Sequence, residues 1–175
     1  MVSEGNIQGW FVLIFVSVGA NPHPFNRLVE KMDELVRNGE VKEEVILQVG
    51  MTPYQPMYVK KCKKFWSIKE YESILKKCNL IISHAGLGNV MAAREHKKPI
   101  IVVPRQKRFS EHIDDHQLEL SHYLEKNKMC FAVYDIDKLK DKIKIAERRG
   151  MLFERKKVPE MIEMIKRYVE SYLRV

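Results

Sequence analysis

Residues 80–89 read LIISHAGLGN, an apolar run joined to a helical stretch by a turn that contains two glycines. The run 80–82 has the length and the β-branched content of a buried strand, and residues 89–96 have a helical pattern. A buried strand that turns directly into a helix is one half of a βαβ unit. We therefore expect a parallel sheet whose connections are helices.

The same alternation of strand and helix continues on both sides of this stretch. Further apolar runs lie at 11–18, 45–49, 100–103 and 131–134, and helical stretches lie at 24–38, 68–77, 111–126 and 136–147. The runs do not alternate with polar residues, which is typical of strands covered on both faces. Residues 58–66 contain lysines and are expected as an edge strand or a loop. The pattern predicts an α/β fold with an open, doubly wound, mostly parallel sheet of the Rossmann-like class.

Helix boundaries also follow from the residue types. Pro24 suits the first position of the helix at 24–38, and Gly39 suits its end. Near the C-terminus, residues 157–174 place their apolar side chains on one helical stripe. This pattern predicts an amphipathic helix, packed either on its own domain or on a partner protein.

Length and composition limit the classes of protein. The 175 residues, 45% of them hydrophobic, suit one domain over residues 1–175. Three cysteines without a C-x-x-C pair argue against a disulfide framework and a zinc ribbon, and favour a reducing cytoplasmic compartment. The longest apolar run, at 10–18, is nine residues, whereas a membrane-spanning helix needs about 20.

The net charge of +8 predicts an anionic neighbour. A phosphorylated ligand, an anionic membrane surface and nucleic acid all fit, and so does a basic surface that serves solubility alone. Nucleic acid is the weakest of these, because aromatic and arginine residues do not interleave along one segment as a stacking platform requires.

The turn at 83–89 is the first candidate site. Gly86 and Gly88 would let a ligand approach the backbone, and the N-terminus of the following helix suits a phosphate. Neither a dinucleotide fingerprint nor a Walker A loop is present. A tight turn without a ligand remains the alternative, in which His84 would be a hydrogen-bonded structural residue.

The second candidate site is the segment 104–117, which holds three cations, three carboxylates and two histidines. Arg105 and its neighbouring cations could neutralise a diphosphate, and Asp115, His116 and Gln117 could bind sugar hydroxyls. A rival interpretation is zinc, because His112 and His116 have the spacing of two ligands on one helix face. Its third ligand would come from Glu111, His84 or His122. An ordinary solvated helix start is the remaining alternative.

Together these motifs resemble a known family. Residues 83–89, 98–105, 111–112 and 115–117, supported by 16–19 and 48–50, are similar to the C-terminal, donor-binding domain of family-28 glycosyltransferases. The likeness extends from Val16 to Asp135. It is strongest to the stand-alone form of that domain, the catalytic subunit of two-part UDP-N-acetylglucosamine transferases, and to exopolysaccharide counterparts.

The resemblance implies a UDP-sugar-dependent hexosyltransferase that is one half of a B-type glycosyltransferase. It would bind UDP-N-acetylglucosamine and transfer the sugar, without a metal or another cofactor, to a lipid-linked acceptor. A membrane-anchored partner subunit would hold that acceptor, so this chain would be cytoplasmic and peripheral at the membrane face. The alternative is a non-catalytic nucleotide-binding regulatory subunit.

The resemblance also implies roles for individual residues. His84 would be catalytic, and Arg105 would stabilise the charge that develops on the diphosphate. Many relatives have a ribose-binding glutamate where this chain has Ala92, so Glu111 is expected as its substitute. The donor-binding set is Gly19, Gly86, Gly88, Asn89, Arg105, Glu111, Asp115, His116 and Gln117.

Overall fold

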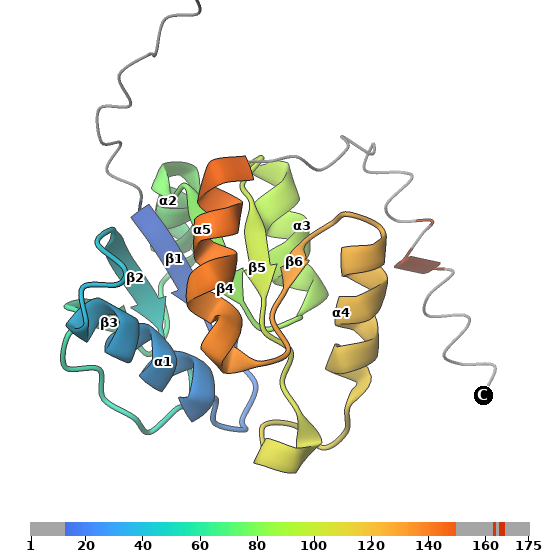
Figure 1. The fold of residues 1–175 in the computed structure, drawn as a ribbon, viewed down its shortest axis with the longest axis horizontal. Helices are drawn as coiled ribbons and strands as arrows, with labels where there is room; N and C mark the ends of the chain where they lie inside the picture. Colours follow the sequence, from blue (N-terminus) through green and yellow to red (C-terminus); the bar gives the residue numbers. More distant parts are fainter. Residues whose placement is uncertain (1–12, 150–162, 164, 167–175) are drawn as a thin grey trace, which may run out of the picture.

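The computed structural model describes residues 13–149, 163, 165 and 166. A six-stranded sheet in the order β3-β2-β1-β4-β5-β6 forms its centre (Figure 1). Every pair of neighbouring strands is parallel. The strands are β1 (Leu13–Ser17), β2 (Glu44–Gln48), β3 (Lys61–Lys63), β4 (Leu80–Ser83), β5 (Ile100–Val102) and β6 (Phe131–Ala132). The predicted Rossmann-like α/β sheet is confirmed.

The strand order creates one special position in the sheet. The chain builds outward from β1 through β2 to β3, then returns to the other side of β1 to add β4, β5 and β6. The loops that follow β1 and β4 therefore run to opposite sides, and the position between them is the switch-point crevice at which ligands of open α/β sheets bind. Ser17 and Ser83 are paired in register, so both loops begin at the same level.

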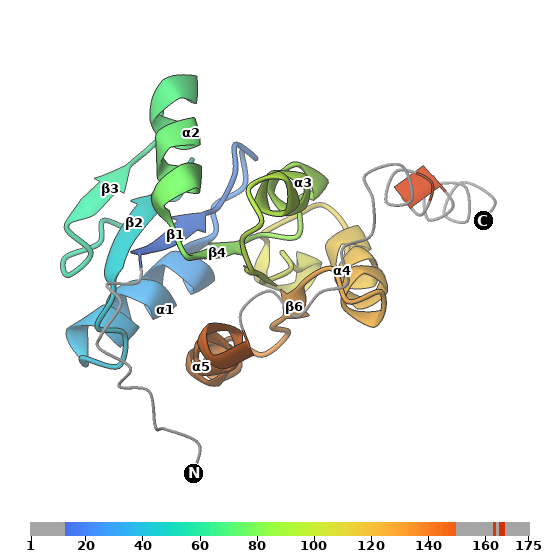
Figure 2. The ribbon, with the colours of Figure 1, turned by 90° about the horizontal axis from the view of Figure 1, so that it is seen from above.

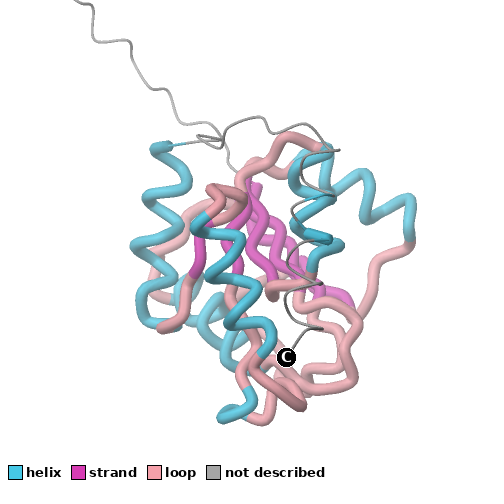
Figure 3. Tube along the Cα trace, turned by 90° about the vertical axis from the view of Figure 1, so that its right-hand side faces the viewer, coloured by secondary structure: helices cyan, strands magenta, loops and turns pink. Residues whose placement is uncertain are grey.

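Helices cover both faces of the sheet. They are α1 (Asn26–Arg37), α2 (Ile68–Lys77), α3 (Leu87–Glu95), α4 (His116–Lys126) and α5 (Leu139–Arg149). Figure 2 shows α1 and α5 on one face and α2, α3 and α4 on the other, and Figure 3 shows the strands enclosed between helices. Alternate residues of β1 belong to the hydrophobic clusters on opposite faces of the sheet. Ile14 and Val16 pack with α1 and α5, and Phe15 packs with the helices on the other face. Burial on both faces explains the continuous apolar runs.

The predicted ends of α1 are partly confirmed. Gly39 has a φ of +66°, and the N–H groups of Gly39 and Glu40 donate to the carbonyl oxygens of Val36 and Leu35, a pattern known as the Schellman motif. The start is wrong, because α1 begins at Asn26 rather than at Pro24. Phe25 is instead fully buried, and its backbone N–H donates to Oγ1 of Thr52.

Two further elements, β3 and α4, can be compared with the sequence prediction. The lysine-rich stretch 58–66 contributes β3, which is an edge strand as predicted. The helix expected from Glu111 begins only at His116, because a short 3-10 turn (Lys107–Phe109) and a left-handed Ser110 precede it.

The amphipathic helix predicted at 157–174 lies outside the described residues apart from three positions. Within the described part of the chain, no helix is long and apolar enough to cross a membrane.

Candidate functional site

A histidine enclosed by two glycines marks the crevice between β1 and β4. Gly19 follows β1 with a φ of +75°, and Gly86 follows β4. A Cβ atom added to either glycine would overlap the imidazole ring of His84. The structure therefore brings three of the predicted site residues together, although 65 positions separate Gly19 from His84 in the sequence.

The surroundings of His84 keep its ring neutral. Burial lowers the pKa of His84 from 6.5 to about 4, and the positive charges of Arg105 and His112 act in the same direction. Its Nδ1 atom is buried and has no hydrogen-bond partner among the described residues. At neutral pH the side chain is therefore an uncharged imidazole, which can hydrogen-bond a ligand but cannot neutralise a phosphate by charge.

The lowered pKa of His84 predicts a loss of stability in mild acid. Between pH 6.5 and 4 the unfolded chain binds a proton at this position and the folded chain does not, so stability falls as pH decreases. We expect about 2 kcal/mol less free energy of unfolding at pH 5 than at pH 7 from this group. Urea denaturation at both pH values should show the difference in the wild type. It should be largely missing from His84→Ala, and an equal pH dependence in both proteins would contradict the assignment.

The N-terminus of α3 opens into the same crevice. Gly86 is the residue that precedes the helix, and Gly88 lies in its first turn. The helix start has no side-chain cap and no acidic residue in its first turn. A Cβ atom at Gly88 would meet nothing within 4 Å. Space is therefore available beside backbone N–H groups that carry the positive end of the helix dipole, an arrangement that suits an anion.

Asn89 was expected to bind the donor, but its side chain forms hydrogen bonds within the protein. Its Nδ2 donates to Oγ of Ser83, and its Oδ1 accepts a hydrogen bond of 2.7 Å from the hydroxyl of Tyr71. The side chain thus links β4, α2 and α3 behind the glycine turn. Nothing in the sequence indicated Tyr71, because the contact joins residues 18 positions apart on separate helices.

Arg105 lies beneath the site rather than on its surface, which corrects the expectation of a cation facing the diphosphate. The residue is 1% exposed. Its Nη2 donates to the carbonyl oxygen of Val18 at 2.8 Å, and its Nη1 donates to those of His23, Pro24 and Glu111. Burial lowers its pKa to about 10, so it remains charged. Its position lets it tie the loop after β1 to the segment that leads into α4.

Glu111 is also directed into the interior, which corrects its expected role as a ribose ligand. It is 3% exposed, and both carboxylate oxygens bind Arg27, at 2.9 and 2.8 Å. One of them also accepts a hydrogen bond from the backbone N–H of Gln106. Sequence reasoning did not identify Arg27, since a partner 84 residues away leaves no local signal.

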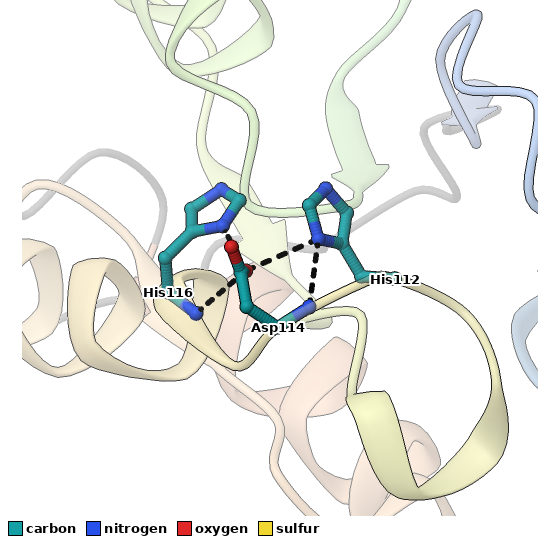
Figure 4. Close-up of side chains that lie close together, drawn as sticks. All are labelled: His112, Asp114 and His116. Atoms are coloured by element: carbon teal, nitrogen blue, oxygen red, sulfur yellow. Dashed lines mark hydrogen bonds and ion pairs between the residues drawn. The ribbon is translucent and has the colours of Figure 1, made fainter.

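The remaining predicted residues surround the start of α4. His112 and His116 both contact Oδ1 of Asp114, and their rings meet edge to face (Figure 4). Asp115 is exposed and accepts a hydrogen bond of 2.8 Å from the backbone N–H of Lys107. Gln117 is 5% exposed, and its Oε1 accepts from the backbone N–H of Arg105.

These residues divide into an outer and an inner group. His116 and Asp115 are accessible, whereas Gln117 lies with Arg105 and Glu111 in the supporting layer. Arg105 donates to the carbonyl oxygens of Val18 and Glu111, so the segment before α4 lies beside the loop whose Gly19 contacts His84. The two candidate segments of the sequence therefore belong to one site.

Sequence comparison relates the chain to enzymes that transfer sugars. The model of the glycosyltransferase family 28 C-terminal domain matches residues 13–167. The chain is similar to UDP-N-acetylglucosamine--N-acetylmuramyl-(pentapeptide) pyrophosphoryl-undecaprenol N-acetylglucosamine transferase of Prochlorococcus marinus (strain MIT 9312). The two are 24% identical over 152 residues, which cover 82% of this chain and 39% of the relative. The chain thus spans well under half the length of that relative.

Solved structures support the fold. The calicheamicin glycosyltransferase CalG4 aligns with a TM-score of 0.56 and 14% identity, over 89% of this chain and 37% of CalG4. An NMR solution structure of ALG13 aligns with a TM-score of 0.53 and 20% identity, over 78% of this chain and 86% of ALG13. At these identities the likeness concerns the arrangement of strands and helices.

Proposed function

The chain belongs to the glycosyltransferase family 28 C-terminal domain family, and we propose that it binds a UDP-sugar at the crevice between β1 and β4 and provides the donor site of a hexosyltransferase. The observation that carries this proposal is the open N-terminus of α3 beside Gly88, at the point where strand order reverses. A diphosphate fits such a position because backbone N–H groups and the helix dipole both favour its charge.

The same geometry suits departure of the nucleotide. As the bond between the sugar and UDP breaks, negative charge grows on the diphosphate, and fixed N–H donors stabilise that charge more than the ground state. One such donor can lower the barrier by about 3 kcal/mol. His84, whose Nδ1 has no partner among the described residues, lies beside this position and would donate or accept a further hydrogen bond.

The donor sugar would extend from the diphosphate toward the start of α4. His116 and Asp115 are the accessible groups there, and Gln117 would support them from below through its bond to the backbone of Arg105. N-acetylglucosamine is the proposed sugar, because the relative from Prochlorococcus marinus is named for its transfer. Arg105 and Glu111 would act by holding the loops in place.

The acceptor would be bound elsewhere. The chain covers 39% of that relative, so a B-type transferase would need a second domain facing the crevice. We assign this role to a membrane-anchored partner that presents a lipid-linked acceptor, with the present chain at the cytoplasmic membrane face. The base that deprotonates the acceptor hydroxyl would also come from that side. Transfer of labelled sugar by the mixed subunits, but not by either alone, would distinguish a catalytic subunit from a regulatory one.

Substitution of Gly88 tests the proposed diphosphate position. Gly88→Ala should not reduce the melting temperature, since nothing lies within 4 Å of the added methyl group and alanine favours a helix. We expect UDP to raise the melting temperature of the wild type, and the variant to bind UDP at least about tenfold more weakly. Thermal unfolding with a series of UDP concentrations measures both effects.

Gly39→Ala is the matched control, with the opposite outcome. Gly39 also has nothing within 4 Å of an added Cβ, but its φ of +66° is strained for alanine. This variant should melt at a lower temperature and keep the full UDP shift. Absence of a shift in the wild type at millimolar UDP, or equal shifts in the wild type and Gly88→Ala, would refute the proposed site.

A further inference from the structure

Three potential metal ligands converge at the start of α4. One ligand atom each from His112, Asp114 and His116 lies within 4.8 Å of the others. Figure 4 shows both imidazole rings directed at the carboxylate between them. The three side chains are 12%, 45% and 35% exposed in that order, so an ion from solution could reach them.

The distances suit a transition metal. Zinc binds imidazole nitrogen and carboxylate oxygen at about 2.0–2.2 Å, which places two ligands of one tetrahedral ion about 3.4 Å apart. Nδ1 of His112 and Oδ1 of Asp114 are already 3.1 Å apart. Nδ1 of His116 contacts the same Oδ1 atom, and the rings of His112 and His116 have centroids 4.6 Å apart. Small side-chain rotations would admit the ion.

Asp114, rather than the expected Glu111 or His122, is the third potential ligand in the structure. Glu111 is buried in its ion pair with Arg27, and the ring of His122 is stacked on Tyr134 with centroids 4.3 Å apart. The spacing of His112 and His116 does not come from a helix face, because α4 begins only at His116. The chain turn at 112–116 instead places the intervening Asp114 against both rings.

We propose that His112, Asp114 and His116 bind one divalent first-row transition metal ion, with zinc the best fit. Two imidazole nitrogens and one carboxylate oxygen form a ligand set typical of zinc sites with an open position. The fourth position would face solvent and hold water. The site shares His116 with the proposed sugar position, but the metal titrations need neither UDP nor sugar transfer, so they test it separately from the proposed function.

Cobalt and zinc titrations of the full chain test the site. The purified protein, stripped of metal and free of any histidine tag, should bind one equivalent of Co²⁺ with visible absorption bands typical of tetrahedral coordination. Zinc should then displace the cobalt. His112→Ala and Asp114→Asn should each weaken zinc binding at least about tenfold. His122→Ala is the control and should bind as the wild type does, because His122 lies on α4 outside the cluster.

Two outcomes of the titration would contradict the proposed metal site. Absence of a stoichiometric Co²⁺ or Zn²⁺ complex in the wild type would overturn it, and so would unchanged affinity in both ligand variants. Circular dichroism of each variant confirms folding. If His112→Ala does not fold, the nearly isosteric Asp114→Asn decides, since it retains the shape of the side chain and removes only its charge.

Discussion

Replacing Arg105 by methionine is expected to lower the free energy of unfolding by about 3–5 kcal/mol. The substitution removes the donors to the carbonyl oxygens of four residues, and it leaves the buried oxygens of Val18 and Glu111 without these bonds. The other two acceptors, in His23 and Pro24, are partly buried. It also removes a positive charge that the carboxylate of Glu111 stabilises, which raises the pKa of Arg105 against the effect of burial. Urea denaturation at pH 7 would measure the loss.

Two variants separate geometry from charge at this position. Arg105→Lys retains the positive charge, but an ammonium group is a compact donor and cannot span the same carbonyl oxygens, so most of the loss should persist. Arg108→Met removes an exposed arginine three residues away and should change stability by less than about 0.5 kcal/mol. A loss below about 1 kcal/mol in Arg105→Met would show that the buried guanidinium is not a structural tie.

Gly19→Ala is expected to cost about 3 kcal/mol of stability through two separate effects. Its φ of +75° is strained for any residue with a Cβ atom, and the added Cβ would overlap the ring of His84. The clash should also displace His84 from the crevice and weaken UDP binding. Urea denaturation measures the first consequence and isothermal titration with UDP measures the second.

Gly86→Ala is the matched substitution on the other side of the ring. Gly86 has a φ of −73°, so alanine there meets only the clash with His84. Adding His84→Ala should recover nearly all of the stability lost in Gly86→Ala, but only part of that lost in Gly19→Ala, where the backbone strain remains. If the effects at Gly19 and His84 were simply additive, the two residues would not be in contact.

The sheet was predictable because the information for each strand is local. Apolar runs such as 80–82 and 100–103 correspond to β4 and β5, and α2 has the predicted bounds. Gly39 ended α1 as expected, since a left-handed position selects glycine. Even the edge position of β3 followed from its lysines, which an interior strand would have to bury.

The arrangement of the candidate site was predictable only in part. The glycine turn lies between β4 and α3, as the strand and helix pattern predicts, at the edge of the sheet that the carboxyl ends of parallel strands share. The start of α4 was expected five residues too early, since the charges at 111–115 suit a helix start as well as a loop. Asp114, which joins the two histidines, could have been found from its position midway between them.

By itself, the sequence determined the fold class, the edge of the sheet that carries the candidate site and the segments proposed to form it. Only the tertiary structure decided which polar side chains of those segments face the crevice. Arg105 and Glu111 have the residue types of ligand-binding groups, yet both are buried by contacts with α1 and the loop before it. The physical reason is that periodicity and turn chemistry act between neighbours in the chain, whereas burial and ion pairing depend on partners about 80 residues away.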